Sequence, residues 1–265
     1  MIRALFWRGL RQHARLLGVL SLSLALFEWA LVWVAARIDM GPGFRQLLGT
    51  ILPPDVVDII FGQFGFASFG GAVSFGYQHP MALVAGVAMM VVVATLPAQE
   101  RETGLLDMIL SRPLTRRQYL MAAALLVVVA AVLPSAALLV GGAVGLTVVE
   151  APEAIPWTRY IPSAIMLTLL LLAVGSYVLL FATDAKRRGT AVSQAVGITL
   201  LFYWLDFMGD YWDLLDTARR LSPFHYFDPA AAADTGMAGA AVAVLGSITL
   251  GAGAGAFLNF PRQNL

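Results

Sequence analysis

The sequence contains no cysteine, which excludes disulfide bonds, thiolate metal sites and a cysteine nucleophile. It is also poor in charge. Only 12% of its 265 residues are Asp, Glu, Lys or Arg and 59% are apolar, against about 25% and roughly 45–50% in an ordinary soluble domain. A soluble protein of this size needs more charge to cover its surface, so the composition indicates that lipid surrounds much of the chain. The net charge of +1 provides no basic field for nucleic acid.

Residues that would bind a nucleotide or a metal are missing as well. A P-loop needs G-x-x-x-x-G-K-[ST], but the only lysine, Lys186, lies in TDAKRRG without the required glycines. The three histidines, His13, His79 and His225, fall in different segments, so no cluster predicts a metal site. We therefore expect this chain to bind no cofactor and no metal, and to have no enzyme activity of its own.

Six apolar stretches are long enough to cross a bilayer, which takes about 20 residues of helix. We expect transmembrane spans at residues 16–37, 81–98, 119–149, 161–183, 189–207 and 237–260. The predicted fold is an all-α membrane protein, with a single transmembrane domain over residues 1–265. The first stretch is too long for the apolar core of a signal peptide, about 7–15 residues, so we interpret it as a retained span.

The distribution of basic residues predicts how these spans are oriented. With the N-terminus inside, twelve of the 17 Arg and Lys residues lie in inner segments and the other five in outer segments. Both termini are therefore expected in the cytoplasm. The excess of Arg over Lys, together with much Ala, Gly and Val, suggests a bacterial source and hence a multi-pass protein of the bacterial plasma membrane.

The first fifteen residues have the pattern of an amphipathic helix that lies on the inner leaflet. At about 100° per residue, the side chains of Ile2, Leu5, Phe6 and Leu10 fall in one arc of about 140° and the arginines in the opposite arc. The alternative is that the arginines simply flank the first span, as the positive-inside rule requires. The residues expected at the membrane interface are Arg3, Phe6, Trp7, Arg8, Arg11 and Arg15.

Two outer segments, residues 38–80 and 208–236, are longer than a simple link between spans. The first contains the pair Pro53–Pro54 and then a Gly- and Phe-rich run that is too broken to span and too apolar for a solvated loop. We expect short re-entrant or interfacial helices there. The second combines an acidic amphipathic stretch with a turn whose aromatic residues suit the outer membrane interface. This turn contains Pro223, Phe224, His225 and Tyr226.

Glu28 is the one carboxylate expected well inside a span, where charge is costly and usually faces protein or water. Two alternatives are open: it lines a substrate pathway or binds a cation, or it is protonated or hydrogen-bonded and structural. Small residues are dense in the third and sixth spans, where they would let helices approach closely within one chain or between two chains. These glycines are Gly141, Gly142, Gly145, Gly246, Gly251, Gly253 and Gly255.

The inner segment between the second and third spans is the most informative part of the chain. Its leucines at 105, 106 and 110 recur at helical spacing, which predicts a short amphipathic helix over residues 99–113. Acidic residues at 100 and 102 are expected in its first turn and a basic one at 112 near its end, where each suits the helix dipole. Thr115 followed by Gln118 predicts a capping box at the start of the third span. From the residues alone, a simple interfacial turn remains an equal alternative.

The pattern E-x-E-x-G-L-L-D-x-x-L-S-R-P-L-T-R-R-x-Y, between the second and third of six spans, resembles the signature of type-2 ABC exporter permeases. A second match, LSPFHYFDPA at residues 221–230, resembles the S-P-F-x-Y-x-x-P turn ahead of the last span. That turn is similar to the one in the subgroup that includes permeases of copper-enzyme maturation and many drug exporters. The layout of the whole chain agrees with the family.

The resemblance implies a half-transporter driven by two copies of a separate nucleotide-binding ATPase subunit, which would hold ATP and Mg. A second permease chain, identical or paralogous, would complete a pathway that exports an amphipathic or lipid-soluble substrate such as a drug, an antibiotic or a lipid. In that family the inner segment is the coupling helix, which contacts the ATPase. On this sequence its contact residues are Glu100, Glu102, Gly104, Leu105, Leu106, Asp107, Leu110, Arg112 and Pro113.

Two alternative functions require features that are not visible here. An intramembrane enzyme needs paired Glu and His, or a Ser–His dyad, within the spans, and Glu28 has no such companion. An ion-coupled secondary transporter calls for inverted repeats or broken helices with acidic pairs at the midplane. Co-purification of an ATPase subunit would distinguish the expected transporter from both.

Overall fold

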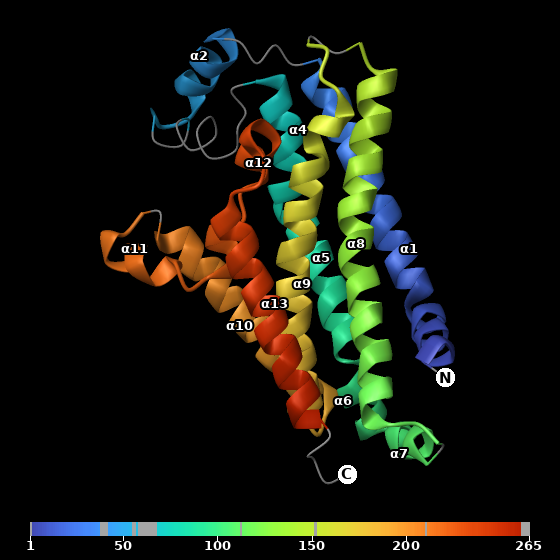
Figure 1. Ribbon diagram of the computed structural model, residues 1–265. Helices are drawn as coiled ribbons and strands as arrows, with labels where there is room; N and C mark the ends of the chain where they lie inside the picture. Colours follow the sequence, from blue (N-terminus) through green and yellow to red (C-terminus); the bar gives the residue numbers. More distant parts are fainter. Residues whose placement is uncertain are drawn as a thin grey trace.

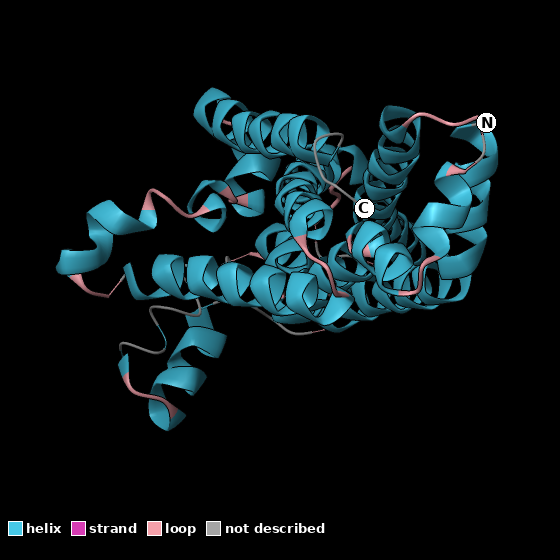
Figure 2. Ribbon diagram, turned by 90° about the horizontal axis from the view of Figure 1, so that it is seen from below, coloured by secondary structure: helices cyan, strands magenta, loops and turns pink. Residues whose placement is uncertain are grey.

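The computed structural model describes residues 2–37, 42–54, 57, 68–111, 113–150, 153–209 and 211–260. Every regular element in this part of the chain is a helix (Figure 2). Six stretches are long and apolar enough to span a membrane, which confirms the predicted all-α fold with six spans. They are α1 (Ile2–Ala35), α4 with α5 (Phe69–Gln78 and Pro80–Ala94), α8 (Arg116–Val148), η1 with α9 (Trp157–Tyr160 and Ile161–Asp184), α10 (Arg188–Gly209) and α13 (Gly239–Asn259).

Shorter helices lie at the two ends of this bundle (Figure 1). At one end are α6 (Leu96–Glu102) and α7 (Leu105–Leu110), together with the beginning of α1 and the end of α13. At the opposite end are α2 (Pro42–Ile51) and α12 (Pro229–Thr235), and α11 (Asp213–Arg219) projects to the side beyond α10. Since α1 begins and α13 ends beside α6, the start of the first span and the end of the last span lie on the same side, as an even number of spans requires.

The second span begins at Phe69, twelve residues before the start predicted at residue 81. The Gly- and Phe-rich run that was expected in an outer segment forms α4 instead. Pro80 then occupies the first turn of α5, where its missing N–H costs no hydrogen bond. His79 Nδ1 accepts a hydrogen bond from the Met81 backbone N at 3.1 Å. The proline therefore marks a break between two helices of one span and not the end of an outer loop. Residues 58–67, the rest of that run, lie outside the described residues.

Helix α1 is continuous from Ile2 to Ala35, so the structure shows no boundary between the predicted interfacial helix and the first span. The apolar face of its first four turns packs on the bundle: Gly9 and His13 are buried, and Leu5 and Leu10 contact the core. The opposite face, which carries the arginines, is largely exposed. The amphipathic pattern is thus used for helix packing at this end. A position on the inner leaflet stays a prediction, as does the interfacial placement of α2 and α11.

Helix α1 runs parallel to α8, and glycines of α8 let the two backbones approach closely. A Cβ atom on Gly141 would lie 2.1 Å from a carbonyl oxygen of α1, and one on Gly145 would lie 2.8 Å from an α1 side chain. These glycines therefore serve packing within the chain. In the sixth span the situation differs, because a Cβ atom on Gly246, Gly251 or Gly253 would meet no atom of another described element within 4 Å.

Candidate functional site

The segment predicted as one helix over residues 99–113 consists of two short helices, α6 and α7. Helix α6 ends at Glu102, and Gly104 adopts the left-handed conformation, with φ of 69°, before α7 begins at Leu105. Glycine takes this conformation without the strain that a Cβ atom would bring. Glu100 and Glu102 therefore lie at the end of α6, and their predicted place in the first turn of the leucine-bearing helix is wrong. We call residues 96–110 the α6–α7 segment.

The link from α7 to α8 contains Pro113, whereas Arg112 lies outside the described residues. Helix α8 begins with the predicted capping box, which the structure confirms. Thr115 Oγ1 accepts a hydrogen bond from the Gln118 backbone N at 3.2 Å, and Gln118 Oε1 accepts one from the Thr115 backbone N at 3.1 Å. The cap fixes the point at which the chain turns back into the bundle.

Glu100 is buried and lies at the centre of a polar cluster. Its side chain is 3% exposed, and Arg8 of α1 pairs with one carboxylate oxygen. The Tyr119 hydroxyl of α8 donates a hydrogen bond to the other oxygen at 2.6 Å. The Tyr119 ring also stacks on Phe260 at the end of α13, with 5.7 Å between ring centroids. A buried carboxylate is costly unless it is paired, and here the pairing joins α1, α6 and α8, with α13 stacked alongside.

The next two residues connect α6 to the link between α9 and α10. Arg101 Nη1 donates a hydrogen bond to the Ala185 carbonyl oxygen at 2.9 Å. Glu102 Oε2 accepts one from the Arg188 backbone N at 2.9 Å. Because Arg188 begins α10, this carboxylate lies where a helix N-terminus attracts negative charge. Partial burial lowers the pKa of the Arg101 guanidinium, which stays charged at neutral pH nonetheless.

Helix α7 divides its apolar side chains between the core and the surface. Leu106 is fully buried and Leu110 is partly buried, whereas Met108 is 68% exposed and Leu105 is 36% exposed. Asp107 is exposed beside them. Leu106 and Glu100, both predicted to touch the ATPase, are therefore held inside their own chain. The side chains that α7 offers to a partner are Leu105, Asp107 and Met108, next to a groove of about 290 Å³ between α7 and α1.

The sequence alone did not identify Tyr119, Arg101 and Met108 as functional residues in or beside this segment. Tyr119 lies in the R-x-Y end of the motif, and Arg101 lies between the two glutamates, so both stood next to recognised positions. Nothing local pairs Arg8 with Glu100, because 92 residues separate them. The available signal for this pair was the presence of opposite charges in two segments that were predicted to lie on the inner side.

The outer turn fastens α10 to the elements that follow it. Ser222 Oγ donates a hydrogen bond to the Phe202 carbonyl oxygen of α10 at 2.8 Å. The same oxygen accepts a hydrogen bond from the Phe224 backbone N at 3.1 Å. Asp206 Oδ1 of α10 lies 3.6 Å from Nδ1 of His225 in the turn. These contacts give the turn a structural role. Helix η2 contains its four predicted residues: Pro223, Phe224, His225 and Tyr226.

Glu28 is fully buried between α1, α4 and α8. Two glycines make room for it: a Cβ atom on Gly76 would lie 1.7 Å from Glu28 Oε2, and one on Gly142 would lie 3.5 Å from Cγ. Neither carboxyl oxygen has a hydrogen-bond partner among the described residues. In the same part of the chain, no group of three or more His, Asp and Glu could hold a metal ion. The close glycine packing favours the structural alternative for Glu28.

Comparison with known proteins agrees with this architecture. A family model described as "ABC-2 family transporter protein" matches residues 55–250, a range that includes the whole α6–α7 segment and the outer turn. No curated protein and no solved structure gives a match. ABC-2 permeases lack the ATPase and work with separate nucleotide-binding ATPase subunits. With six candidate spans and a match over most of its length, this chain belongs to the ABC-2 transporter family as a non-enzymatic, multi-pass permease subunit.

Proposed function

We propose that this permease is one half of an ATP-driven exporter and that the exposed face of α7 docks on the ATPase subunit. The observation that carries the proposal is the set of contacts between the α6–α7 segment and the spans. The Glu100 cluster connects the segment to α1, α8 and the end of α13, and Glu102 connects it to the start of α10. A displacement of Leu105, Asp107 and Met108 is therefore passed to four spans and not absorbed in a loop.

The assembled transporter in this proposal contains two ATPase subunits, which hold ATP and Mg, and two permease chains that are identical or paralogous. Both termini lie in the cytoplasm of a bacterial cell, since the end of the bundle that carries α6 and α7 also carries most of the basic residues. Helices α10 and α13 bury the smallest share of their residues among the six spans, which leaves faces for the second permease chain.

The substrate proposed is amphipathic or lipid-soluble, and a groove between α5 and α10 supports it. The groove has a volume of about 450 Å³ and is lined mainly by valines of α5 and by Val196, Leu200 and Tyr203 of α10. Its Thr199 hydroxyl is already occupied, since Oγ1 lies 2.6 Å from the Tyr177 hydroxyl. The volume falls within the range of about 300–1,000 Å³ that is typical of ligand pockets. Such a lining offers apolar contact area and few hydrogen bonds.

Docking is tested by the double substitution Leu105→Arg/Met108→Arg. The permease is purified together with its ATPase subunit, and bound ATPase, thermal stability and substrate-stimulated ATP hydrolysis are measured. Because both side chains reach the surface of α7, we expect an unchanged Tm and loss of the ATPase from the complex. The matched control is Leu214→Arg/Leu221→Arg, at positions that are 90% and 73% exposed and outside the α6–α7 segment.

Retention of the ATPase and of stimulated hydrolysis in the Leu105→Arg/Met108→Arg variant would refute docking through α7. Leu106→Arg does not serve this purpose, because a charge at a fully buried position disrupts the core of the chain itself.

A further inference from the structure

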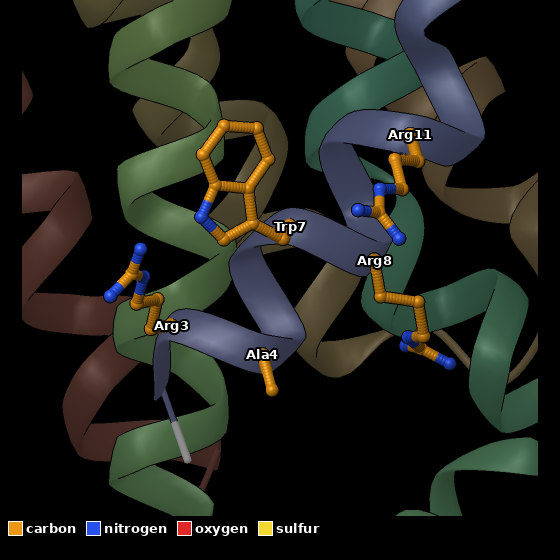
Figure 3. A pocket seen from close by; sticks show the side chains of 5 residues that line it. All are labelled: Arg3, Ala4, Trp7, Arg8 and Arg11. Carbon is orange, nitrogen blue, oxygen red and sulfur yellow. The ribbon is translucent and has the colours of Figure 1, made fainter.

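The geometry points to a binding site on α1 for the phosphate group of an anionic phospholipid of the inner leaflet. The site is a shallow hollow of about 570 Å³ lined by Arg3, Ala4, Trp7, Arg8 and Arg11. Figure 3 shows Trp7 with Arg3 on one flank and with Arg8 and Arg11 on the other. Three guanidinium groups line the hollow and no acidic side chain does, so its charge suits an anion.

Arg3 and Arg11 are the residues available to hold this anion. Arg8 is paired with the buried carboxylate of Glu100, so its charge is already engaged. Arg3 and Arg11 are exposed, and within the described residues neither forms an ion pair or a side-chain hydrogen bond. Steps of four residues place Arg3, Trp7 and Arg11 along one face of the helix. The planar guanidinium group binds phosphate through paired N–H donors, which makes arginine suited to this ligand.

The side of α1 that carries Arg11 and Arg15 continues into the membrane as an exposed apolar stripe. After Arg15, the side chains of Val19, Leu22 and Leu26 are 63%, 62% and 56% exposed. At a rise of about 1.5 Å per residue, Arg11 and Leu26 are about 22 Å apart along the helix. That is about the thickness of one leaflet, headgroups included.

A phospholipid has the same layout as this face, with a phosphate at the surface and acyl chains below it. Trp7, whose side chain is 46% exposed, has an amphipathic ring of the kind enriched at the headgroup level. A soluble phosphate or an acidic protein surface would use the arginines but not the apolar stripe. The juxtaposition of both therefore identifies a lipid as the ligand, and it does not depend on the function proposed above.

The test measures lipid binding to the full-length purified permease in detergent. Phosphatidylglycerol and phosphatidylcholine are titrated separately, and bound lipid is counted by native mass spectrometry. The variant is Arg3→Gln/Arg11→Gln. The control is Lys186→Gln/Arg187→Gln, which removes the same charge from an exposed link at the same end of the bundle. A third variant, Arg3→Lys/Arg11→Lys, keeps the positive charge at both positions. The Tm of each variant reports whether its fold is intact.

We expect phosphatidylglycerol to bind more tightly than phosphatidylcholine. Loss of both arginines should weaken phosphatidylglycerol binding about 30-fold, because each basic residue near an anionic surface contributes roughly a factor of five. The lysine variant should keep most of the binding, and the control should bind like the unmodified chain. An equal loss in the control and in Arg3→Gln/Arg11→Gln would overturn the proposal.

Two further results would overturn the choice of ligand. Inorganic phosphate and glycerol 3-phosphate are added as competitors, and displacement of the lipid by either at equal concentration would assign the hollow to a soluble phosphate. The Arg3→Gln/Arg11→Gln variant is also purified together with the ATPase subunit, and loss of that subunit with phosphatidylglycerol binding retained would assign this face to a protein partner. The lipid assignment requires that neither occurs.

Discussion

Replacing Arg8 should destabilise the protein more than replacing Glu100, although the two side chains form one ion pair. The Glu100 side chain is 3% exposed and that of Arg8 is 37% exposed. Arg8→Gln leaves a buried carboxylate whose remaining side-chain donor, among the described residues, is the neutral Tyr119 hydroxyl. Breaking a buried pair costs about 3–5 kcal/mol, which the partial exposure of Arg8 reduces to about 2–3 kcal/mol. After Glu100→Gln, Arg8 can turn to water and the amide oxygen can still accept the Tyr119 hydrogen bond, so the loss is about 1 kcal/mol.

Thermal unfolding of the purified permease in detergent, followed by tryptophan fluorescence, measures this difference. In a chain of this size about 1 kcal/mol shifts the Tm by about 2–4 °C, so we expect a drop of about 4–12 °C for Arg8→Gln and about 2–4 °C for Glu100→Gln. The double variant should resemble Glu100→Gln, because no buried charge is left to neutralise. Arg117→Gln, an exposed arginine in the first turn of α8, is the control. An Arg8→Gln drop no larger than that of Glu100→Gln would refute the cluster as described.

Three further substitutions test the packing and the polar contacts. Gly141→Ala places a Cβ atom 2.1 Å from an α1 carbonyl oxygen and should lower the Tm. Gly246→Ala, in open space, should leave the Tm unchanged or raise it. Equal effects of the two substitutions would contradict close packing of α1 on α8. Ser222→Ala removes the hydrogen bond between the outer turn and α10 and should lower the free energy of unfolding by about 1–2 kcal/mol. An unchanged Tm would show that this contact does not hold the turn. Glu28→Gln should preserve both Tm and substrate-stimulated ATP hydrolysis if the carboxyl is structural; loss of stimulation at an unchanged Tm would instead assign Glu28 to the substrate pathway.

Features set by neighbouring residues were predictable from the sequence. The six spans follow from runs of apolar residues, and the capping box of α8 follows from Thr115 and Gln118, three positions apart. Where local signals have two meanings, the prediction was wrong. Pro80 breaks a helix and also begins one, so the start of the second span was placed too late. Gly104 ends α6, which divides a segment that helical periodicity presented as one helix.

Contacts between distant residues could not be read from periodicity. The spacing of the α7 leucines shows that the helix has an apolar face, but it does not show whether that face meets a partner or the same chain. Leu106 meets its own core, and Met108 faces outward. The burial of Glu100 depends on Arg8 and Tyr119, which come from two other helices. The charge pattern predicts the side of the membrane on which these residues lie, but it does not predict which of them pair.

The close packing of α1 on α8 has a mechanical consequence. Gly141 and Gly145 hold the two helices together near one end, and Arg8 and Tyr119 share the Glu100 carboxylate near the other. The pair therefore moves as one rod, which at 1.5 Å per residue is about 50 Å long. A tilt of about 10° about the end that carries α6 would carry the opposite end about 9 Å sideways for a rod of that length. A small rotation at one membrane face thus becomes a displacement as wide as a helix at the other.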